Sequence, residues 1–277
     1  MKEDRVAFVQ FRGNAGDRNP FGMTGAALLG TALAKHFDVD PLIIGTPRTP
    51  SADQDWTHAL STARAELKEF AGAYETILLS ARIPITAMSR CACALATLPV
   101  VARLNKTAKI VWFDAHGDLN IPSTSRSGYL GGMVLSGAAG LWQTGLGSNL
   151  DLSNVILVGA RDLDPAEQKL VDTGAVHHVA PGSQLLERLS EMIGNAPLYV
   201  HIDCDVLNPG IVPTEFTVPE GLSADELHGA CELLAANEIV GLEIAEFQSV
   251  WSDSGVEASP HAIVDAVTPI ITKVIGH

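Results

Sequence analysis

Residues Ile110–Asp118 read IVWFDAHGD, and residues Leu198–Asp205 read LYVHIDCD. Each stretch is a short apolar run of the kind that forms a buried strand, followed by polar side chains. Alternate positions share one face of an extended chain. In these stretches they are occupied by Asp114, His116 and Asp118, and by Asp203 and Asp205. Carboxylates gathered at neighbouring strand ends would repel one another unless cations lay between them, because burying unpaired charge is costly. The two stretches therefore predict a metal site at one edge of a sheet.

The rest of the chain alternates short apolar runs with helical stretches, which is typical of a parallel α/β sheet. The predicted strands are Val6–Val9, Pro41–Ile44, Thr76–Leu79, Ile110–Phe113, Val155–Val158, Leu198–Ile202 and Ile239–Ile244. The predicted helices are Gly25–His36, Ala52–Ala71, Ala92–Leu104, Pro165–Asp172, Gly182–Ile193, Ser223–Asn237 and His261–Ile275. We therefore expect a three-layer α/β/α fold with a central, mainly parallel sheet. Such sheets bind ligands beyond the carboxyl ends of their strands.

Length and composition favour one domain over residues 1–277 rather than two small ones. The 277 residues are 47% hydrophobic, enough to bury a full core, and no repeat or linker-like stretch divides them. Gly and Ser gather at Pro122–Gly132 and Gly145–Ser153, which we expect to be active-site loops. The net charge of −14, from 32 acidic and 18 basic residues, argues against nucleic acid as a partner, since phosphate binding depends on Lys and Arg.

The sequence also predicts a cytoplasmic protein without a membrane partner. Residues Met1–Arg5 lack the basic-then-apolar layout of a signal peptide, and no uncharged apolar run reaches the roughly 20 residues that a membrane span needs. Four cysteines are too few for a disulfide scaffold, and they show no paired zinc-binding spacing. We expect them to be reduced thiols.

Either acidic motif alone has an ordinary structural explanation, because an aspartate after a strand often caps a helix or a turn. Two such motifs after two buried strands favour metal binding. Their oxygen and nitrogen ligands suit Mn²⁺-like ions in octahedral or near-octahedral sites.

With these motifs the chain resembles the ureohydrolases, the family of arginases, agmatinases, formimidoylglutamases and guanidino-acid hydrolases. The motifs DAHxD and DxDxxxP begin at Asp114 and Asp203. The resemblance, which extends over nearly the whole chain, implies an arginase-like fold and two divalent ions, with Mn²⁺ preferred and Zn²⁺ or Fe²⁺ as alternatives. It implies that one ion is held by Asp114, Asp118 and Asp203, and the other by Asp114, His116, Asp203 and Asp205. It further implies a hydrolase of linear amidines, in which a hydroxide shared by the ions cleaves a guanidino-type C–N bond and releases urea.

The family has a further metal-binding histidine, in a GGDHS motif upstream of DAHxD, that this chain lacks. A gapless register places Cys91 at the histidine position, whereas a competing register places Ser80–Ile83 there and leaves no ligand. We prefer Cys91, because the gapless register also aligns the following helix and because cysteine can coordinate a metal. A thiolate would shift preference toward Zn²⁺ or Fe²⁺ and leave one site partly filled. A free cysteine is otherwise usually a small buried hydrophobe, the role we expect for Cys93 and Cys204.

The resemblance also assigns the substrate side of the site. Asn120 and Ser127 fall where arginases bind the α-carboxylate of the substrate, which indicates an amino-acid-like substrate. Gly131 stands where arginase has a proton-shuttling histidine. The leaving amine must then be protonated from elsewhere or by water. Protonation is unnecessary if the leaving group is less basic, as with an N-hydroxyguanidine such as N-hydroxyarginine. Arginine, guanidino acids and a formimidoyl compound are the other candidates.

Three further acidic or hydroxyl side chains match family positions. Asp164 matches the residue that reaches the substrate amino group, although it or Asp162 could equally cap the helix that opens at Pro165. Thr217 matches a threonine near the metal-bound groups. Glu246 matches the carboxylate that pairs with the guanidinium and is, with Asp118 as proton carrier, the predicted catalytic pair.

Two alternatives belong to other functional classes. Histone-deacetylase-like enzymes share the arginase-type fold but use one zinc and tandem histidines, and no His-His pair precedes DAHGD. A degenerate, non-catalytic member acting as a subunit or binding module would explain the loss of the GGDHS histidine and the shuttle histidine. Within the family, a formimidoylglutamase-like hydrolase also stays open. The family is commonly trimeric or hexameric, so we expect a homo-oligomer that acts on a small molecule.

Overall fold

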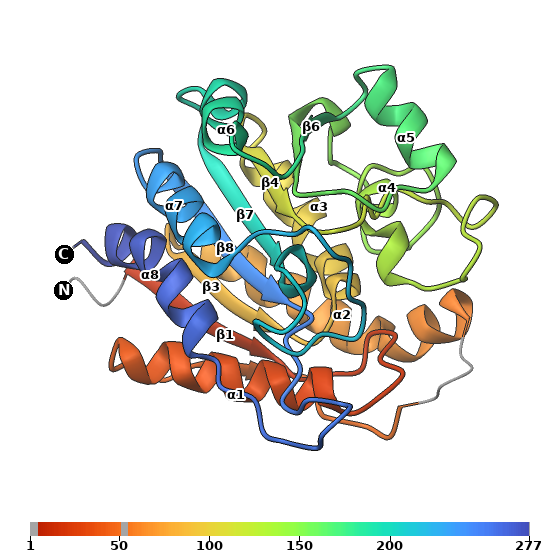
Figure 1. The fold of residues 1–277 in the computed structure, drawn as a ribbon. Coiled ribbons are helices and arrows are strands. Elements are labelled where there is room, and N and C mark those ends of the chain that lie inside the picture. Colours follow the sequence, from red (N-terminus) through yellow and green to blue (C-terminus); the bar gives the residue numbers. More distant parts are fainter. Residues whose placement is uncertain (1–4, 51–54, 277) are drawn as a thin grey trace.

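The computed structural model describes residues 5–50 and 55–276. Within these ranges it contains one eight-stranded sheet in which every pair of neighbours is parallel, in the order β2-β1-β3-β8-β7-β4-β5-β6 (Figure 1). The strands are β1 (Val6–Phe11), β2 (Leu42–Ile44), β3 (Ile83–Met88), β4 (Lys109–Phe113), β5 (Val155–Val158), β6 (His177–Val179), β7 (Leu198–Asp203) and β8 (Ile239–Ala245). Because one sheet joins strands from both ends of the chain, we propose that residues 1–277 form one domain.

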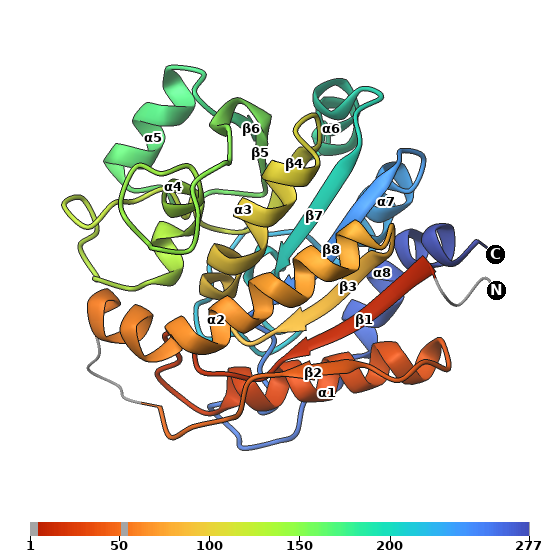
Figure 2. The ribbon, with the colours of Figure 1, turned by 180° about the vertical axis from the view of Figure 1, so that it is seen from behind.

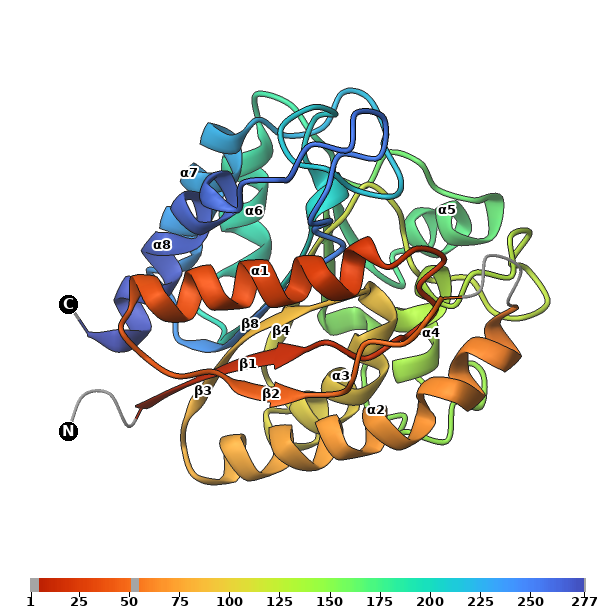
Figure 3. The same ribbon diagram turned by 90° about the horizontal axis from the view of Figure 1, so that it is seen from below.

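Helices cover both faces of the sheet, which confirms the three-layer α/β/α fold. The first face carries α1 (Phe21–His36), α6 (Leu185–Ile193), α7 (Ala224–Leu234) and α8 (His261–Ile275). The second carries α2 (Trp56–Leu79), α3 (Ala94–Leu104), α4 (Val134–Ala138) and α5 (Pro165–Asp172). Figure 2 shows α2 and α3 across the second face, and Figure 3 shows α1, α7 and α8 on the side of the sheet opposite α2.

Strand β4 contributes to both hydrophobic cores. Ile110 and Trp112 belong to the core under α2 and α3, whereas Val111 and Phe113 belong to the core under α1 and α8. A strand segment buried on both faces needs apolar side chains at every position, which is why Ile110–Phe113 of β4 is a continuous apolar run in the sequence. No helix in the described ranges is long and apolar enough to span a membrane.

The predicted strand Thr76–Leu79 is wrong, because these residues form the last turn of α2. Ile77 continues a series of buried helix positions that includes Phe70 and Tyr74, and this spacing is helical. The true strand, β3, begins at Ile83. The error bears on Cys91, because Ser80–Ile83 lies at the amino end of β3, away from the edge where the acidic motifs lie.

Other boundaries differ only at their ends. Helix α2 begins at Trp56 after the N-cap Asp55, so the start of the predicted helix at Ala52 falls outside the described residues. Strand β6 and helix α4 were not predicted; both are short, and β6 carries two histidines rather than an apolar run. The residues Met1–Asp4, used above to exclude a signal peptide, also lie outside the described ranges.

Candidate metal and substrate site

A cavity of about 180 Å³ lies at the carboxyl ends of β3, β4, β7 and β8. The structure brings most of the predicted metal ligands into its wall, namely Cys91, His116, Asp118, Asp203 and Asp205, together with the predicted catalytic Glu246. These residues come from four different strand ends. The parallel sheet is what makes them neighbours, since the carboxyl ends of its strands share one edge.

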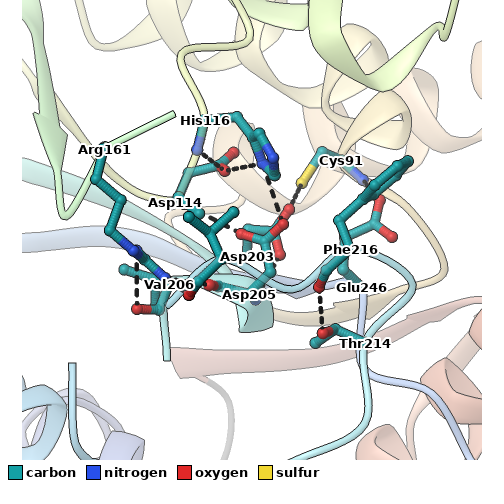
Figure 4. Close-up of polar contacts among 12 residues, drawn as sticks. Cys91, Asp114, His116, Arg161, Asp203, Asp205, Val206, Thr214, Phe216 and Glu246 are labelled. Carbon is teal, nitrogen blue, oxygen red and sulfur yellow. Dashed lines mark hydrogen bonds and ion pairs between the residues drawn. The ribbon is translucent and has the colours of Figure 1, made fainter. Parts of the chain in front are cut away.

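At this edge of the sheet, metal-ligating atoms of residues 5–50 and 55–276 form three groups whose members lie within 4.8 Å of one another. The groups are Cys91 with Asp114 and Asp118, Asp114 with His116 and Asp205, and Cys91 with Asp203 and Glu246. The side chains of the second group face one another in Figure 4, where Cys91 Sγ points at Asp203. Asp114 and Cys91 each belong to two of the groups, whereas Asp203, which the resemblance also places at both ions, belongs to one.

Local contacts hold the carboxylates in place. Trp112 Nε1 donates a hydrogen bond to Asp114 Oδ2 at 2.9 Å, and the backbone N of His116 donates to Asp114 Oδ1 at 2.7 Å. The backbone N of Asp205 donates to Asp203 Oδ1 at 2.8 Å. Each carboxylate therefore has an oxygen fixed by the chain at the strand end, which defines the direction of the rest of the group.

The acidic cluster is electrostatically strained. Burial raises the pKa of Asp118 and of Asp203 well above the usual 3.8, and the neighbouring carboxylates raise both further. Burial lowers the pKa of His116, but its hydrogen bonds to Asp114 and Asp205 outweigh this and raise the pKa to about 12. The carboxylates of the cluster are thus stabilised by any bound positive charge, whether a proton or a metal ion.

Asp118 and Glu246 show a second kind of strain. Both have left-handed backbone conformations, with φ of 49° and 64°, which non-glycine residues seldom adopt; Asp38, Ala81 and Glu220 adopt it away from the cavity. The buried Oδ2 of Asp118 also has no hydrogen-bond partner among residues 5–50 and 55–276. Since an unpartnered buried oxygen is costly, these observations fit divalent cations in the cluster.

Addition of Mn²⁺ to the metal-free protein is expected to raise its melting temperature. At about 100 times the dissociation constant, the gain in unfolding free energy is about 2.7 kcal/mol. The gain should be larger at neutral than at acidic pH. Because the folded-state pKa of Asp118 and Asp203 is raised, the metal-free fold loses stability as the pH rises from 3.8 through that pKa, and a bound cation offsets this loss. Thermal unfolding with Mn²⁺ and with a chelator measures both trends; equal melting temperatures would contradict a metal site here.

Cys91 lies at the carboxyl end of β3, in a short 3-10 turn (Cys91–Cys93). Its Sγ is 3.0 Å from Asp203 Oδ2, and its backbone N donates to Glu246 Oε1 at 3.0 Å. Burial raises the pKa of this thiol, as do Asp203 and other carboxylates, so without a cation it stays protonated. The position therefore favours the register that made Cys91 a candidate ligand. Cys93 and Cys204 are buried and belong to the hydrophobic cores, as expected.

The predicted substrate residues are only partly brought together. Asn120, Ser127 and Asp164 line the cavity, and Asn120 Nδ2 donates to Asp164 Oδ2 at 2.9 Å. Asp164 is also the N-cap residue of α5, so the two roles considered for it are compatible. Thr217 is exposed and is not among the cavity residues in the described chain, whereas its neighbour Phe216 is.

The two predicted loops also differ. Several residues of Pro122–Gly132 line the cavity, but none of Gly145–Ser153 does within the described chain. Glu167, which sequence reasoning missed, is buried in the cavity wall and accepts hydrogen bonds from the backbone N of Leu119 and of Asp164, both at 2.9 Å. It thereby ties the segment after DAHGD to α5. Its spacing from Asp164, three residues into a helix, is a capping-box signal that could have been recognised.

Tyr129 fills the space beside Gly131. A Cβ added at Gly131 would overlap the Tyr129 ring. The Tyr129 hydroxyl donates to Glu246 Oε1 at 3.4 Å, and its ring packs against Phe216 with centroids 5.4 Å apart. A side chain at Gly131, the position that the resemblance aligned with the shuttle histidine of arginase, would therefore overlap a tyrosine that contacts the predicted catalytic carboxylate.

Gly131→Ala should destabilise the protein by about 1–3 kcal/mol, the usual cost of overpacking, because the Tyr129 ring must move. Gly132→Ala is the matched control: among the described residues, no heavy atom outside its chain neighbours lies within 4 Å of that added Cβ. Urea denaturation measures both variants. Equal stability of the two would show that Tyr129 does not occupy this space.

Glu246 is paired with an arginine that sequence reasoning missed. Arg90 is fully buried, and its Nη1 lies 2.6 Å from Glu246 Oε2. The same guanidinium pairs with Asp17 Oδ1 at 2.9 Å and with Glu215 Oε2 at 2.6 Å. Burial raises the pKa of Glu246 more than Arg90 lowers it, to about 7. Arg90 directly precedes Cys91 in the sequence, but its partners come from distant segments, so no local pattern marks it.

Known proteins match this chain in sequence and in fold. A model of the arginase family matches residues 44–270. The chain is 36% identical to the N(omega)-hydroxy-L-arginine amidinohydrolase of Streptomyces lavendulae, over 95% of this chain and 96% of the relative. It is 26% identical to the arginase of Bacillus caldovelox, over 88% of each chain. The crystal structure of arginase from Bacillus subtilis subsp. subtilis str. 168 superposes with a TM-score of 0.81, at 20% identity and 98% coverage of both chains. The chain therefore belongs to the arginase family and, as the resemblance implied, is a hydrolase of guanidino-type C–N bonds.

Proposed function

We propose that this hydrolase acts on an N-hydroxyguanidino amino acid of the N-hydroxyarginine type. Hydrolysis of the bond between the guanidino carbon and the chain nitrogen of N-hydroxyarginine yields ornithine and hydroxyurea; the same cleavage of arginine yields ornithine and urea. The leaving amine is that of ornithine in both reactions, so the less basic leaving group considered from the sequence does not apply, and the amine needs a proton with either substrate. The observation that carries the proposal is the pairing of Glu246 with Arg90. The amidinohydrolase name of the Streptomyces lavendulae relative points in the same direction.

The pairing matters because it limits what Glu246 offers to a substrate. One oxygen, Oε2, is taken by the Arg90 guanidinium, and Oε1 already accepts from Cys91 N and from the Tyr129 hydroxyl. A full two-point pair with a cationic guanidinium needs both oxygens. An N-hydroxyguanidine is less basic than a guanidine because of its electronegative oxygen, so it carries less positive charge. The missing second contact with Glu246 therefore costs it less binding free energy than it costs a guanidine.

The residues of the cavity have separable roles in the reaction. We propose that Cys91, Asp114, Asp118 and Asp203 hold one divalent ion, and that Asp114, His116, Asp203 and Asp205 hold the other. When bound, the ions supply Lewis acidity, which makes water nucleophilic at neutral pH.

On the protein side, Glu246 orients the guanidino group over the cluster. The amino-acid end of the substrate binds to Asn120, Ser127 and Asp164. This assignment is supported by their position in the wall of the same cavity as Glu246. Asp118 carries a proton to the leaving amine once its contact with the metal loosens, since its Oδ2 has no hydrogen-bond partner in the described chain. Tyr129 closes the place of the arginase histidine, so this chain needs Asp118 or water for the transfer.

The test is a substrate panel of L-arginine, N-hydroxy-L-arginine, agmatine and guanidino acids. Metal-free protein is reconstituted separately with Mn²⁺, Zn²⁺ and Fe²⁺, and urea, hydroxyurea and the amine product are quantified. We expect kcat/KM to be highest for N-hydroxy-L-arginine. A higher value for L-arginine would contradict the substrate assignment, and no product with any compound would favour a formimidoyl substrate or the non-catalytic alternative.

We further propose Mn²⁺ as the native metal. Zn²⁺ or Fe²⁺ would compete with it for the site to which Cys91 contributes a ligand. Because imidazole is a harder ligand than thiolate, Cys91→His should shift metal preference toward Mn²⁺ and fill that site more completely. Elemental analysis of wild type and variant after reconstitution in an equimolar mixture of the three ions measures this. Identical metal content in both proteins would contradict a ligand role for Cys91.

A cytoplasmic location and a homo-oligomer, either trimeric or hexameric, complete the proposal. All four cysteines are free thiols, which fits a reducing compartment. The edge strand β2 exposes Leu42 and Ile43, apolar side chains that a neighbouring subunit would cover. Light scattering coupled to size exclusion gives the subunit number.

A further inference from the structure

A buried chain of three side chains runs from the cavity into the sheet. Cys91 Sγ lies 3.1 Å from His201 Nε2, and His201 Nδ1 lies 2.8 Å from Glu243 Oε1. His201 and Glu243 are fully buried, and neither is needed in the mechanism above. A buried histidine and a buried glutamate with no catalytic task call for an explanation, because each is costly to bury.

The backbone of the sheet builds this array. Tyr199, His201 and Asp203 occupy alternate positions of β7 and so share one face. In the pairing of β7 with β8, His201 stands directly opposite Glu243. The alternation of side chains along β7 thus places His201 on the same face as the candidate ligand Asp203. The register between β7 and β8 places the Glu243 carboxylate beside the His201 ring.

Both partners are held rigidly. Glu243 Oε2 accepts hydrogen bonds from the Tyr199 hydroxyl at 2.5 Å and from Thr97 Oγ1 at 2.8 Å. The His201 ring stacks on the Trp112 ring with centroids 3.5 Å apart and an interplanar angle of 4°. Nδ1 faces Glu243 and Nε2 faces Cys91 Sγ. Because a thiolate can only accept a hydrogen bond, the contact that holds it is a hydrogen on Nε2; with Nδ1 also donating to Glu243, the ring is then an imidazolium paired with that carboxylate.

A cysteine that contacts a histidine, which in turn contacts an acidic side chain, is also the arrangement found in nucleophilic cysteine sites. Here, however, Cys91 Sγ lies 3.0 Å from Asp203 Oδ2 as well. A carboxylate at that distance would repel a thiolate unless a cation lay between them. The geometry therefore suits a sulfur that coordinates a metal better than a sulfur that attacks a substrate.

We propose that His201, fixed by Glu243, is the positioning residue that holds Cys91 Sγ in the metal ligand set. The proposal rests on the proposed metal site. The partners of metal ligands commonly orient them in this way, and losing such a partner costs about 10- to 100-fold in metal affinity. His201 thereby adapts the site to a cysteine at the place of the GGDHS histidine.

Cobalt binding tests the proposal without reference to turnover, because a thiolate bound to Co²⁺ gives a near-ultraviolet charge-transfer absorption. Metal-free wild type titrated with Co²⁺ should develop this band, and Cys91→Ser should not. Cys93→Ser is the matched control, because Cys93 is equally buried two residues away and should leave the band unchanged. A band that persists in Cys91→Ser would remove Cys91 from the site and overturn the proposal with it.

Two substitutions of His201 distinguish its contact with Glu243 from its contact with Cys91. Asparagine can replace Nδ1 toward Glu243 but does not reach Cys91, whereas glutamine can place an amide near the Nε2 position. We expect His201→Asn to weaken Co²⁺ binding by about 10- to 100-fold and to diminish the band, and His201→Gln to restore part of both.

A folded His201→Asn protein with wild-type affinity and band, alongside a Cys91→Ser protein that lacks the band, would overturn the positioning role alone. If His201→Asn does not fold, Glu243→Gln serves in its place, because its amide keeps the shape of the carboxylate while weakening the hold on Nδ1. Its expected loss of Co²⁺ affinity has the same direction, and wild-type affinity would overturn the proposal. Product release from the substrate panel is a separate measurement, so failure of the substrate assignment stays distinguishable.

Discussion

Asp203→Asn will reduce product release by about 1,000-fold or more, because metal ions contribute several kcal/mol to the stabilisation of the transition state and Asp203 is proposed to bind both of them. Asparagine keeps the shape of the side chain and an oxygen for the 2.8 Å hydrogen bond from Asp205 N. What it removes is the negative charge. Metal content, measured by elemental analysis after dialysis, should fall in parallel.

The same substitution should stabilise the metal-free protein. The pKa of Asp203 is raised by burial and by the neighbouring carboxylates, so its ionised form opposes folding at neutral pH. Asparagine carries no such penalty. Metal-free Asp203→Asn is therefore expected to melt above metal-free wild type, and to gain less on addition of Mn²⁺.

Asp162→Asn is the matched control for this prediction. Asp162 lines the same cavity but belongs to none of the three ligand groups found among the described residues. Its activity and metal content should stay near those of wild type. Wild-type metal content and turnover in Asp203→Asn would refute the assignment of the cluster.

Arg90→Met is expected to have the largest effect on stability, a loss of about 3–5 kcal/mol of unfolding free energy. Methionine has a similar length but leaves Glu246 and Asp17, two buried carboxylates, without their guanidinium. Part of this cost can be relieved by proton uptake, so the loss should be smaller at acidic pH. Urea denaturation at two pH values measures both effects.

Arg48→Met provides the comparison. Arg48 pairs with Glu66 at 2.9 Å, but half of the Arg48 side chain is exposed. An exposed pair contributes about 0–1 kcal/mol, so this variant should be nearly as stable as wild type. If the two variants lost equal stability, the buried cluster around Arg90 would not be the strong structural element that its geometry indicates.

The sequence by itself determined the layers and the acidic edge. Helices α5 and α8 have the predicted bounds, and β5 does as well, because each is marked by local signals such as Pro165 at the first turn or a bounded run of β-branched residues. The DAHGD and DCD motifs could be placed at strand ends for the same reason: alternation and chain order are properties of a few adjacent residues.

The predicted strand at Thr76–Leu79 shows where local reading fails. A four-residue apolar run fits a buried strand or the buried side of a helix equally well. Only packing of Ile77 in line with Phe70 and Tyr74 decides for the helix. Because α2 extends to Leu79, the next strand, β3, is Ile83–Met88, and Cys91 follows it at the edge of the sheet where the acidic motifs lie.

Tertiary structure alone decided the environment of the site. Arg90 meets Glu246 across 156 positions of sequence, and Cys91 meets His201 across 110. Tyr129 closes the space at Gly131, and Thr217 remains outside the cavity. Such contacts depend on which strands become neighbours and in which register, and that is set by burial of both sheet faces at once. The motif residues could be recognised because their neighbours along the chain define them, whereas the groups that hold, neutralise and orient them are neighbours only in the folded protein.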